Sequence, residues 1–258
     1  MQNGFVFYEG SSAIDGGPVV GIATGLARGS VNRKTGCLVQ VYILCADMDP
    51  LQAVQIGDDR AICGDCRHRG RVEPHPRTGK PHNTGRSCYV ALFRGPRVVY
   101  EGYRNGAYPF VPPVRAARLL AGRQVRVGAY GDPAALPPAV WKTLLAGAGE
   151  VTSYTHAWRT RGDLQVFSMA SVDSEAEREA ARGLGWRTFR VRSTGDPVLK
   201  GEGQCPASAE MAHATTCSLC MLCDGRRGTH RTDITILAHG TGRRAFERGA
   251  ATQEMADA

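Results

Sequence analysis

Nine cysteines limit what this 258-residue chain can fold into more than any other feature of its sequence. Its first residues, MQNGFVFYEGSSAIDGG, lack the basic start and the apolar core of a secretory signal. We therefore expect the protein in the cytoplasm, where the reducing environment disfavours structural disulfides. Seven of the nine cysteines fall into two groups with the spacing of metal ligands, so the sequence predicts metal binding.

The C-terminal group consists of Cys205, Cys217, Cys220 and Cys223, in the pattern C-x11-C-x2-C-x2-C. Two-residue gaps let neighbouring thiolates converge, and four thiolates satisfy either a [4Fe–4S] cluster or a tetrahedral zinc ion. Zinc ribbons pair two CxxC units across a longer spacer, whereas here three cysteines crowd within seven residues. The crowding favours an iron–sulfur cluster, and zinc is the alternative.

The second group combines three cysteines with a loop that carries three histidines: Cys63, Cys66 and Cys88, with His68, His75 and His82. With a histidine as fourth ligand the group forms a Cys3His zinc site, and without one it leaves an open position on an iron–sulfur cluster. A redox-active CxxC pair is a third interpretation, since thiol pKa values can fall in that motif. The two groups hold two metal centres or share one. Cys37 and Cys45 lie on an apolar predicted strand and are interpreted as core residues.

Alternating strand and helix patterns fill the middle of the chain, which indicates βαβ units and a parallel sheet. We expect an α/β fold, either a partial (β/α) barrel or an open parallel sheet, with cysteine-rich metal-binding segments. The predicted strands are 5–8, 19–22, 37–45, 60–63, 88–93, 97–101, 125–130, 151–154, 165–170, 186–192 and 233–238, and the predicted helices are 47–56, 111–121, 137–148 and 174–183.

The chain divides into four expected segments. Residues 1–95 hold the N-terminal strands, the CxxC pair and a basic loop, and residues 96–200 form the βα repeat core. Residues 201–240 contain the cysteine-rich metal-binding segment and the last strand, and residues 241–258 form a flexible tail. No apolar run approaches the ~18 residues of a membrane span, so we expect no membrane contact. The absence of GxGxxG and GxxxxGK[ST] loops argues against NAD and P-loop chemistry.

Polar side chains follow three of the predicted strands. Asp132 ends GAYGDP, His156 lies in YTHAW, and Asp173 ends SMASVD. The carboxyl ends of the strands form the active face of α/β barrels, so these residues are candidates for a site. His156 is the first candidate, because Tyr154 and Trp158 flank it and can line a pocket. A structural interpretation is equally open, since Asp132 before a proline forms turns and Asp173 can cap a helix.

The formal net charge of +8 comes mostly from arginines spread along the chain, with a denser stretch between residues 67 and 86. This stretch supports a second hypothesis, in which a zinc-stabilised protein binds nucleic acid through a basic loop. The loop has no aromatic residue to stack on bases, which counts against that function. Its basic residues are Arg67, His68, Arg69, Arg71, Arg77, Lys80 and Arg86.

The segments GAYGDPAALP, YTHAW and MASVD resemble the central part of a radical-SAM barrel, over about residues 60–225. This resemblance implies [4Fe–4S] clusters at both cysteine groups and S-adenosylmethionine bound through Gly128, Gly131 and Asp132. It also implies that His156 or Asp132 moves protons or orients the substrate. The spacing of Cys63, Cys66 and Cys88 differs from the CxxxCxxC loop of that family.

The strings NRKTG, VQVYIL, ICGDCRHRG and SCYV, followed by the GDP and THAW elements, resemble an uncharacterised family of cysteine-rich proteins encoded by bacteriophages. The similarity spans most of the chain. It implies a phage context, and therefore the cytoplasm of a bacterial host, but no activity.

Overall fold

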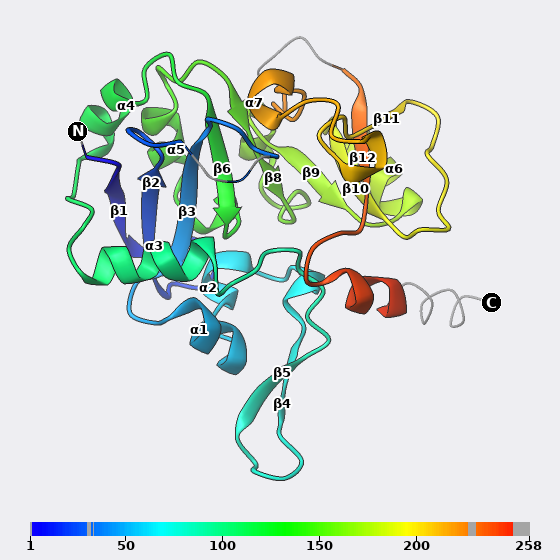
Figure 1. Ribbon diagram of the computed structural model, residues 1–258, viewed down its shortest axis with the longest axis horizontal. Coiled ribbons are helices and arrows are strands. Elements are labelled where there is room, and N and C mark those ends of the chain that lie inside the picture. The colour runs from blue at the N-terminus through cyan, green and yellow to red at the C-terminus, as the bar shows by residue number, and fades with distance from the viewer. Residues whose placement is uncertain (1, 30–31, 33, 227–230, 250–258) are drawn as a thin grey trace.

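The computed structural model describes residues 2–29, 32, 34–226 and 231–249, which form a mixed α/β fold (Figure 1). The strands are β1 (Gly4–Ser11), β2 (Pro18–Thr24), β3 (Val39–Cys45), β4 (Arg71–Pro74), β5 (Pro81–Thr84), β6 (Val125–Tyr130), β7 (Val151–Thr152), β8 (Tyr154–Thr155), β9 (Met169–Val172), β10 (Thr188–Arg192), β11 (Glu202–Gln204) and β12 (Asp233–Leu237). The α-helices are α1 (Pro50–Ile56), α2 (Arg60–Cys63), α3 (Gly95–Arg104), α4 (Pro113–Leu119), α5 (Pro138–Leu144), α6 (Glu175–Gly183) and α7 (Cys217–Cys220). Short 3-10 helices are η1 (Arg67–Arg69), η2 (Pro133–Ala135), η3 (Gly162–Val166) and η4 (Ala209–Met211).

Two five-stranded sheets form the body of the molecule, with strand orders β1-β2-β3-β6-β7 and β11-β12-β10-β9-β8. They meet where Ser153 alone separates β7 from β8. Within these two sheets, the paired strands β3-β6-β7 and β11-β12-β10-β9-β8 are parallel. β1 and β2 add an antiparallel edge to the first sheet. Among the described strands the two ends, β1 and β11, do not pair with each other, so no barrel closes. The expected α/β fold with parallel strands is confirmed, in an open form.

Alternation along the strands divides the apolar residues between the two faces of the second sheet. On β9, Ala170 and Val172 join the main core with Trp141 of α5 and Ala181 of α6. Met169, on the opposite face, joins a smaller core with Ile234 and Ile236 of β12 and with the cysteine-rich segment. The cysteine-rich segment therefore covers the face of the sheet that the α5 and α6 side chains leave open.

Three predicted strands are wrong. Residues 60–63 form α2, a single helical turn in which the Cys63 N–H donates to the Asp59 carbonyl at 2.9 Å. Residues 97–101 belong to α3, which buries Pro96, Val99 and Tyr100 at helical spacing. Residues 88–93 form no strand, and Phe93 is 58% exposed. In each case a short apolar run fits a strand or a helix equally well, and packing decides.

Residues 67–87 were predicted to form a loop, but they are not structureless. They contain η1 and the antiparallel hairpin β4–β5, which projects from the body of the molecule (Figure 1). The strand predicted over 165–170 is also shorter, because η3 occupies residues up to Val166. The remaining predicted helices and strands are confirmed with shifted ends, whereas β11 and α7 were not predicted.

Ser174, the residue after Asp173, caps α6, since its hydroxyl accepts the Glu177 N–H. Of the predicted tail, residues 250–258 lie outside the described residues. Phe246, just before them, stacks on His68 with the ring centroids 5.6 Å apart. No helix in the described parts of the chain is both long and apolar enough to cross a membrane.

Candidate metal centres

The four C-terminal cysteines line one small cavity of about 40 Å³ on the second face of the sheet. Tyr154 of β8 and Phe189 of β10 form its floor together with Ile234 of β12. The structure therefore brings together Cys205, Cys217, Cys220 and Cys223, as their spacing predicts. We call this the thiol cavity.

Two anchors hold the thiol cavity in place from different parts of the chain. The N–H groups of Cys217 and Ser218 donate to the carbonyls of Lys34 and Thr35, at 2.8 and 3.2 Å. Glycine suits position 36 because its φ is +66°, in the left-handed region, and a Cβ there would meet the Ser218 side chain. The other anchor is the buried Arg187 guanidinium, which ion-pairs with Asp224 and donates to the carbonyls of three residues: Leu222, Gly225 and Thr232.

Backbone N–H groups point at the cysteine sulfurs in a repeated pattern. Burial raises the pKa of each of four thiols, and hydrogen bonding from the backbone N–H two residues further along the chain lowers it. Such bonds stabilise a thiolate and are the second-shell contacts that tune sulfur ligands in metal sites. In the thiol cavity, the Tyr154 hydroxyl adds a hydrogen bond to the sulfur of Cys223. The four acceptors are Cys66, Cys88, Cys205 and Cys220, and Tyr154 bonds to Cys223.

Backbone strain is concentrated in the same segment. The non-glycine residues with positive φ among the described residues are Ala212, His213 and Met221, at 51°, 51° and 48°. A left-handed conformation costs roughly 1–2 kcal/mol at each such residue. Strained residues persist where the surrounding structure over-determines them, which is common at functional sites.

Burial raises the pKa of each of the four thiols, but positive side chains act against it. Lys34 lowers the pKa of Cys205 and of Cys217, and Arg126 also lowers that of Cys217. None of the described residues that line the thiol cavity carries a carboxylate side chain. In the described part of the chain, no three Cys, His, Asp or Glu side chains are placed so as to hold a metal ion. Metal binding therefore requires the thiol side chains to turn toward a common point.

The N-terminal group lies around the end of α2, and its three cysteines are half-buried. Burial, and then the charge of its neighbours, raises the pKa of Cys63 far above its ordinary value, and burial raises that of Cys66 to about 12. The pKa of Cys88 is raised by burial as well. A nucleophilic or redox-active cysteine needs a lowered pKa. A metal ligand needs the same thiolate, so the raised pKa values do not separate metal ligation from the redox-pair interpretation of CxxC.

The histidines differ in their ability to complete this group. His68 is engaged at both ring nitrogens, by Ser87 at 2.8 Å and by Asp173 at 3.1 Å. His75 and His82 pack edge to face on the projecting hairpin, 5.2 Å between ring centroids. His156 stands 5.4 Å from His68 between ring centroids, and its buried Nε2 has no hydrogen-bond partner. Among the described histidines, His156 and His82 therefore each keep one buried ring nitrogen without a hydrogen-bond partner, and His156 is the one that lies next to His68 and Asp132.

Asp132 organises the ends of two strands. Its carboxylate accepts hydrogen bonds from three groups, the Ala134 N–H, the Thr155 hydroxyl and the His156 N–H, at 2.9, 2.7 and 2.7 Å. These bonds give Asp132 a structural role at the carboxyl edge of the sheet. The glycines before it serve close packing: a Cβ on Gly131 would lie 2.5 Å from the Ile43 carbonyl, and one on Gly128 2.9 Å from that of Gly131. The contact of these glycines with S-adenosylmethionine stays a prediction.

Strand ends do bring the three polar candidates together. His156 lies beside Asp132, with 3.9 Å between its Nδ1 and the carboxylate, and His68 joins it to Asp173. Burial tends to raise the pKa of Asp173, but the hydrogen bond from His68 and nearby positive charges lower it overall. The three residues therefore form one polar cluster, connected through His68, and the charges of Asp132 and Asp173 act on Cys66.

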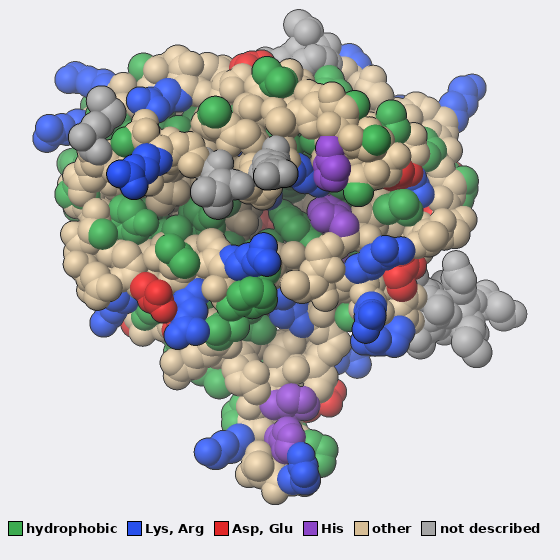
Figure 2. Space-filling view, in the orientation of Figure 1, with side chains coloured by type: hydrophobic (Ala, Val, Ile, Leu, Met, Phe, Trp, Pro, Cys, Tyr) green, Lys and Arg blue, Asp and Glu red, His purple; other side chains and the backbone are tan. Residues whose placement is uncertain are grey.

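The predicted basic loop is only partly free. His68 is buried, the Arg69 guanidinium pairs with Asp59 at 2.7 Å, and Arg86 donates to the Cys88 and Val90 carbonyls. The exposed cations that remain on the projecting hairpin are Arg71, Arg77 and Lys80. Figure 2 shows Lys, Arg and His side chains gathered at its tip.

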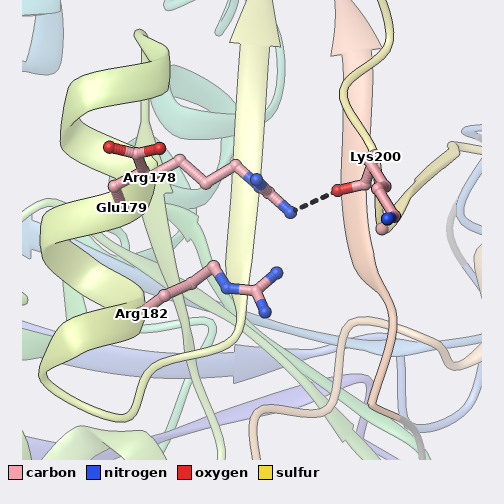
Figure 3. Close-up of a pocket in the computed structure, with 5 residues that line it drawn as sticks. Arg178, Glu179, Arg182 and Lys200 are labelled. Carbon is pink, nitrogen blue, oxygen red and sulfur yellow. Dashed lines mark hydrogen bonds between the residues drawn. The ribbon is translucent and has the colours of Figure 1, made fainter.

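A larger hollow of about 500 Å³ lies elsewhere, beside α6 and β11 (Figure 3). Arg178, Arg182 and Lys200 line it, and Arg178 donates to the Lys200 carbonyl at 3.0 Å. Asp233 pairs with both arginines, at 3.0 and 2.9 Å, Arg178 also contacts Glu202 at 3.5 Å, and Glu179 lines the hollow too. The hollow is therefore a solvent-open edge of an ion-pair network.

Sequence reasoning missed the residues that surround the sulfurs. Lys34 is one of only four lysines in the chain. Arg126 is a charged residue within the otherwise apolar strand VRVGAY, and this is the one sequence signal that could have marked it as functional. Tyr154 was assigned to a pocket around His156 but contacts the thiol cavity. Comparisons of the chain with protein-family models, curated proteins and solved structures find no match.

Proposed function

We propose that this protein binds an iron–sulfur cluster in the thiol cavity and a second metal centre at Cys63, Cys66 and Cys88. The observation that carries the proposal is the convergence of four cysteines on one cavity whose described lining includes no carboxylate side chain. The N–H bonds to sulfur and the strained backbone around Cys217–Cys220 support it, since both are typical of metal-binding segments. A cluster is favoured over zinc because three ligands crowd within seven residues.

The second centre is proposed to use His156 as its fourth ligand. The Nε2 of His156 is free, and the carboxylate of Asp132 lies near its Nδ1, as second-shell carboxylates do beside metal-ligating histidines. A Cys3His set suits zinc or a cluster with one histidine ligand. Radical chemistry with S-adenosylmethionine requires a fourth position open to that cofactor, so the His156 assignment and the radical-SAM interpretation compete.

Anaerobic purification tests the proposal. We expect brown protein with broad absorption near ~400 nm and with both iron and acid-labile sulfide. Colourless protein that contains zinc would replace the cluster with a structural zinc ion. Protein without either metal would refute metal binding. Adding S-adenosylmethionine to the reduced protein and recording its paramagnetic signal tests the radical-SAM version.

Nucleic-acid binding is the second candidate, favoured by the projecting hairpin with its three exposed cations (Figure 1). If the hairpin binds nucleic acid, affinity falls with salt, and neutralising Arg71, Arg77 and Lys80 removes about 0.9 from the salt slope per cation. Unchanged binding in the triple alanine variant would exclude this function for the hairpin.

A further inference from the structure

Lys34 places a positive charge at the mouth of the thiol cavity. Its side chain lines the cavity, and its carbonyl accepts the Cys217 N–H at 2.8 Å. Its ammonium lies 3.4 Å from Nε2 of His239, whose Nδ1 faces the Leu237 carbonyl at 3.1 Å. His239 is held neutral, because burial and then Lys34 lower its pKa to about 4. Among the described residues, Lys34 thus has a neutral partner and no carboxylate.

Arg126 brings a second cation to the same face. Its neighbours Val125 and Val127 are buried in the main core, so alternation turns Arg126 toward the cysteine-rich side of the sheet. The guanidinium donates to the Tyr89 hydroxyl at 2.9 Å and to the Gln40 side chain at 3.4 Å. Within the described chain no carboxylate pairs with it. Arg126 is therefore a second cation with only neutral partners.

Partly buried cations without counter-ions are costly, and nearby negative charge removes that cost. Four thiolates around Zn²⁺, or around a [4Fe–4S] core, carry a net charge of about −2. Lys34 and Arg126 supply two positive charges. Resting on the proposed function, we infer that Lys34 and Arg126 are positioning residues that compensate an anionic, fully thiolate-ligated centre at Cys205, Cys217, Cys220 and Cys223.

The test measures Zn²⁺ affinity of the full-length protein by competition with a chelator, with zinc as the probe whichever metal is native. We expect Lys34→Met with Arg126→Met to weaken binding at the thiol cavity by about tenfold or more, as expected for loss of unit charges near the metal. Lys34→Arg with Arg126→Lys keeps the charges and should bind within about threefold of the wild type. Arg71→Met, on the hairpin, is the matched control for a lost positive charge.

Thiol alkylation followed by peptide mass spectrometry reports which cysteines hold the zinc. Protection of Cys205, Cys217, Cys220 and Cys223 in the wild type, and its loss in the double methionine variant alone, supports the inference. Equal affinity in the wild type and in the double methionine variant overturns it while leaving metal binding intact. A wild type whose four thiols stay reactive in zinc refutes the proposed function itself. Far-UV circular dichroism of the metal-free variants excludes unfolding as the cause.

Discussion

Arg187→Met is predicted to destabilise the protein by about 3–5 kcal/mol, the cost of breaking a buried ion pair. Arg187 directly precedes β10, and its guanidinium is buried. It pairs with Asp224 and donates to the Leu222 and Gly225 carbonyls, which flank Cys223 in the sequence. It also donates to the Thr232 carbonyl, just before β12. Hydrogen bonds from a charged donor contribute about 1.5–3 kcal/mol each. The predicted loss of about 3–5 kcal/mol is smaller than the sum of the four interactions, because water replaces part of them. The loss is large beside a typical total stability of 5–15 kcal/mol.

Urea denaturation followed by circular dichroism measures the free energy of unfolding. Arg187→Lys should recover only part of the loss, because an ammonium cannot span the same four acceptors. Arg97→Met is the control, since Arg97 is 48% exposed and its surface pair with Glu101 is worth at most about 1 kcal/mol. If Arg187→Met loses no more stability than Arg97→Met, the anchoring role of Arg187 is wrong.

Three further predictions concern backbone strain, packing and pH. Ala212→Gly should leave stability equal or raise it by about 1 kcal/mol, because the φ of Ala212 is 51°. Ala180→Gly inside α6 should lower stability by about 1 kcal/mol. In thermal melts, a melting temperature of Ala212→Gly no higher than that of Ala180→Gly would contradict this. Gly131→Ala should cost more than Gly79→Ala, since both have positive φ but only Gly131 has a carbonyl in the way, and equal melting temperatures would contradict the packing role. Burial tends to raise the pKa of Glu202, but the two bonds from Arg190 hold it below its ordinary 4.5. Its stabilisation is therefore present above about pH 4.5 and is lost as pH falls through the lower folded pKa, so Glu202→Gln should flatten the acid limb of the stability–pH curve.

The alternating pattern made the parallel core predictable, because strands such as Val125–Tyr130 and a capped helix after Ser174 carry local signals. The wrong strands share a physical cause. Segments such as Arg97–Glu101 are too short for periodicity to separate helix from strand, and burial of Val99 and Tyr100 against the core decides between them. The hairpin β4–β5 lacked apolar alternation, so its pairing was not visible in the sequence.

The candidate site was predictable from cysteine spacing as far as its sulfur atoms and no further. Residues that complete it come from distant segments: Arg126 lies 91 residues before Cys217, and Lys34 lies 183 residues before it. Such contacts depend on the sheet order, which sequence spacing does not encode. Cys37, predicted as a core residue with Cys45, is exposed, because β3 begins only at Val39.

Native mass spectrometry of the anaerobically isolated protein tests the central claim most directly. The wild type and Cys37→Ser, a substitution of the exposed cysteine, should both carry the added mass of an iron–sulfur cluster at the thiol cavity. The Cys217→Ser, Cys220→Ser variant should lose that mass and keep any metal bound at Cys63, Cys66 and Cys88. A wild type without bound metal, or a bound mass unchanged in the Cys217→Ser, Cys220→Ser variant, would contradict a metal centre in the thiol cavity.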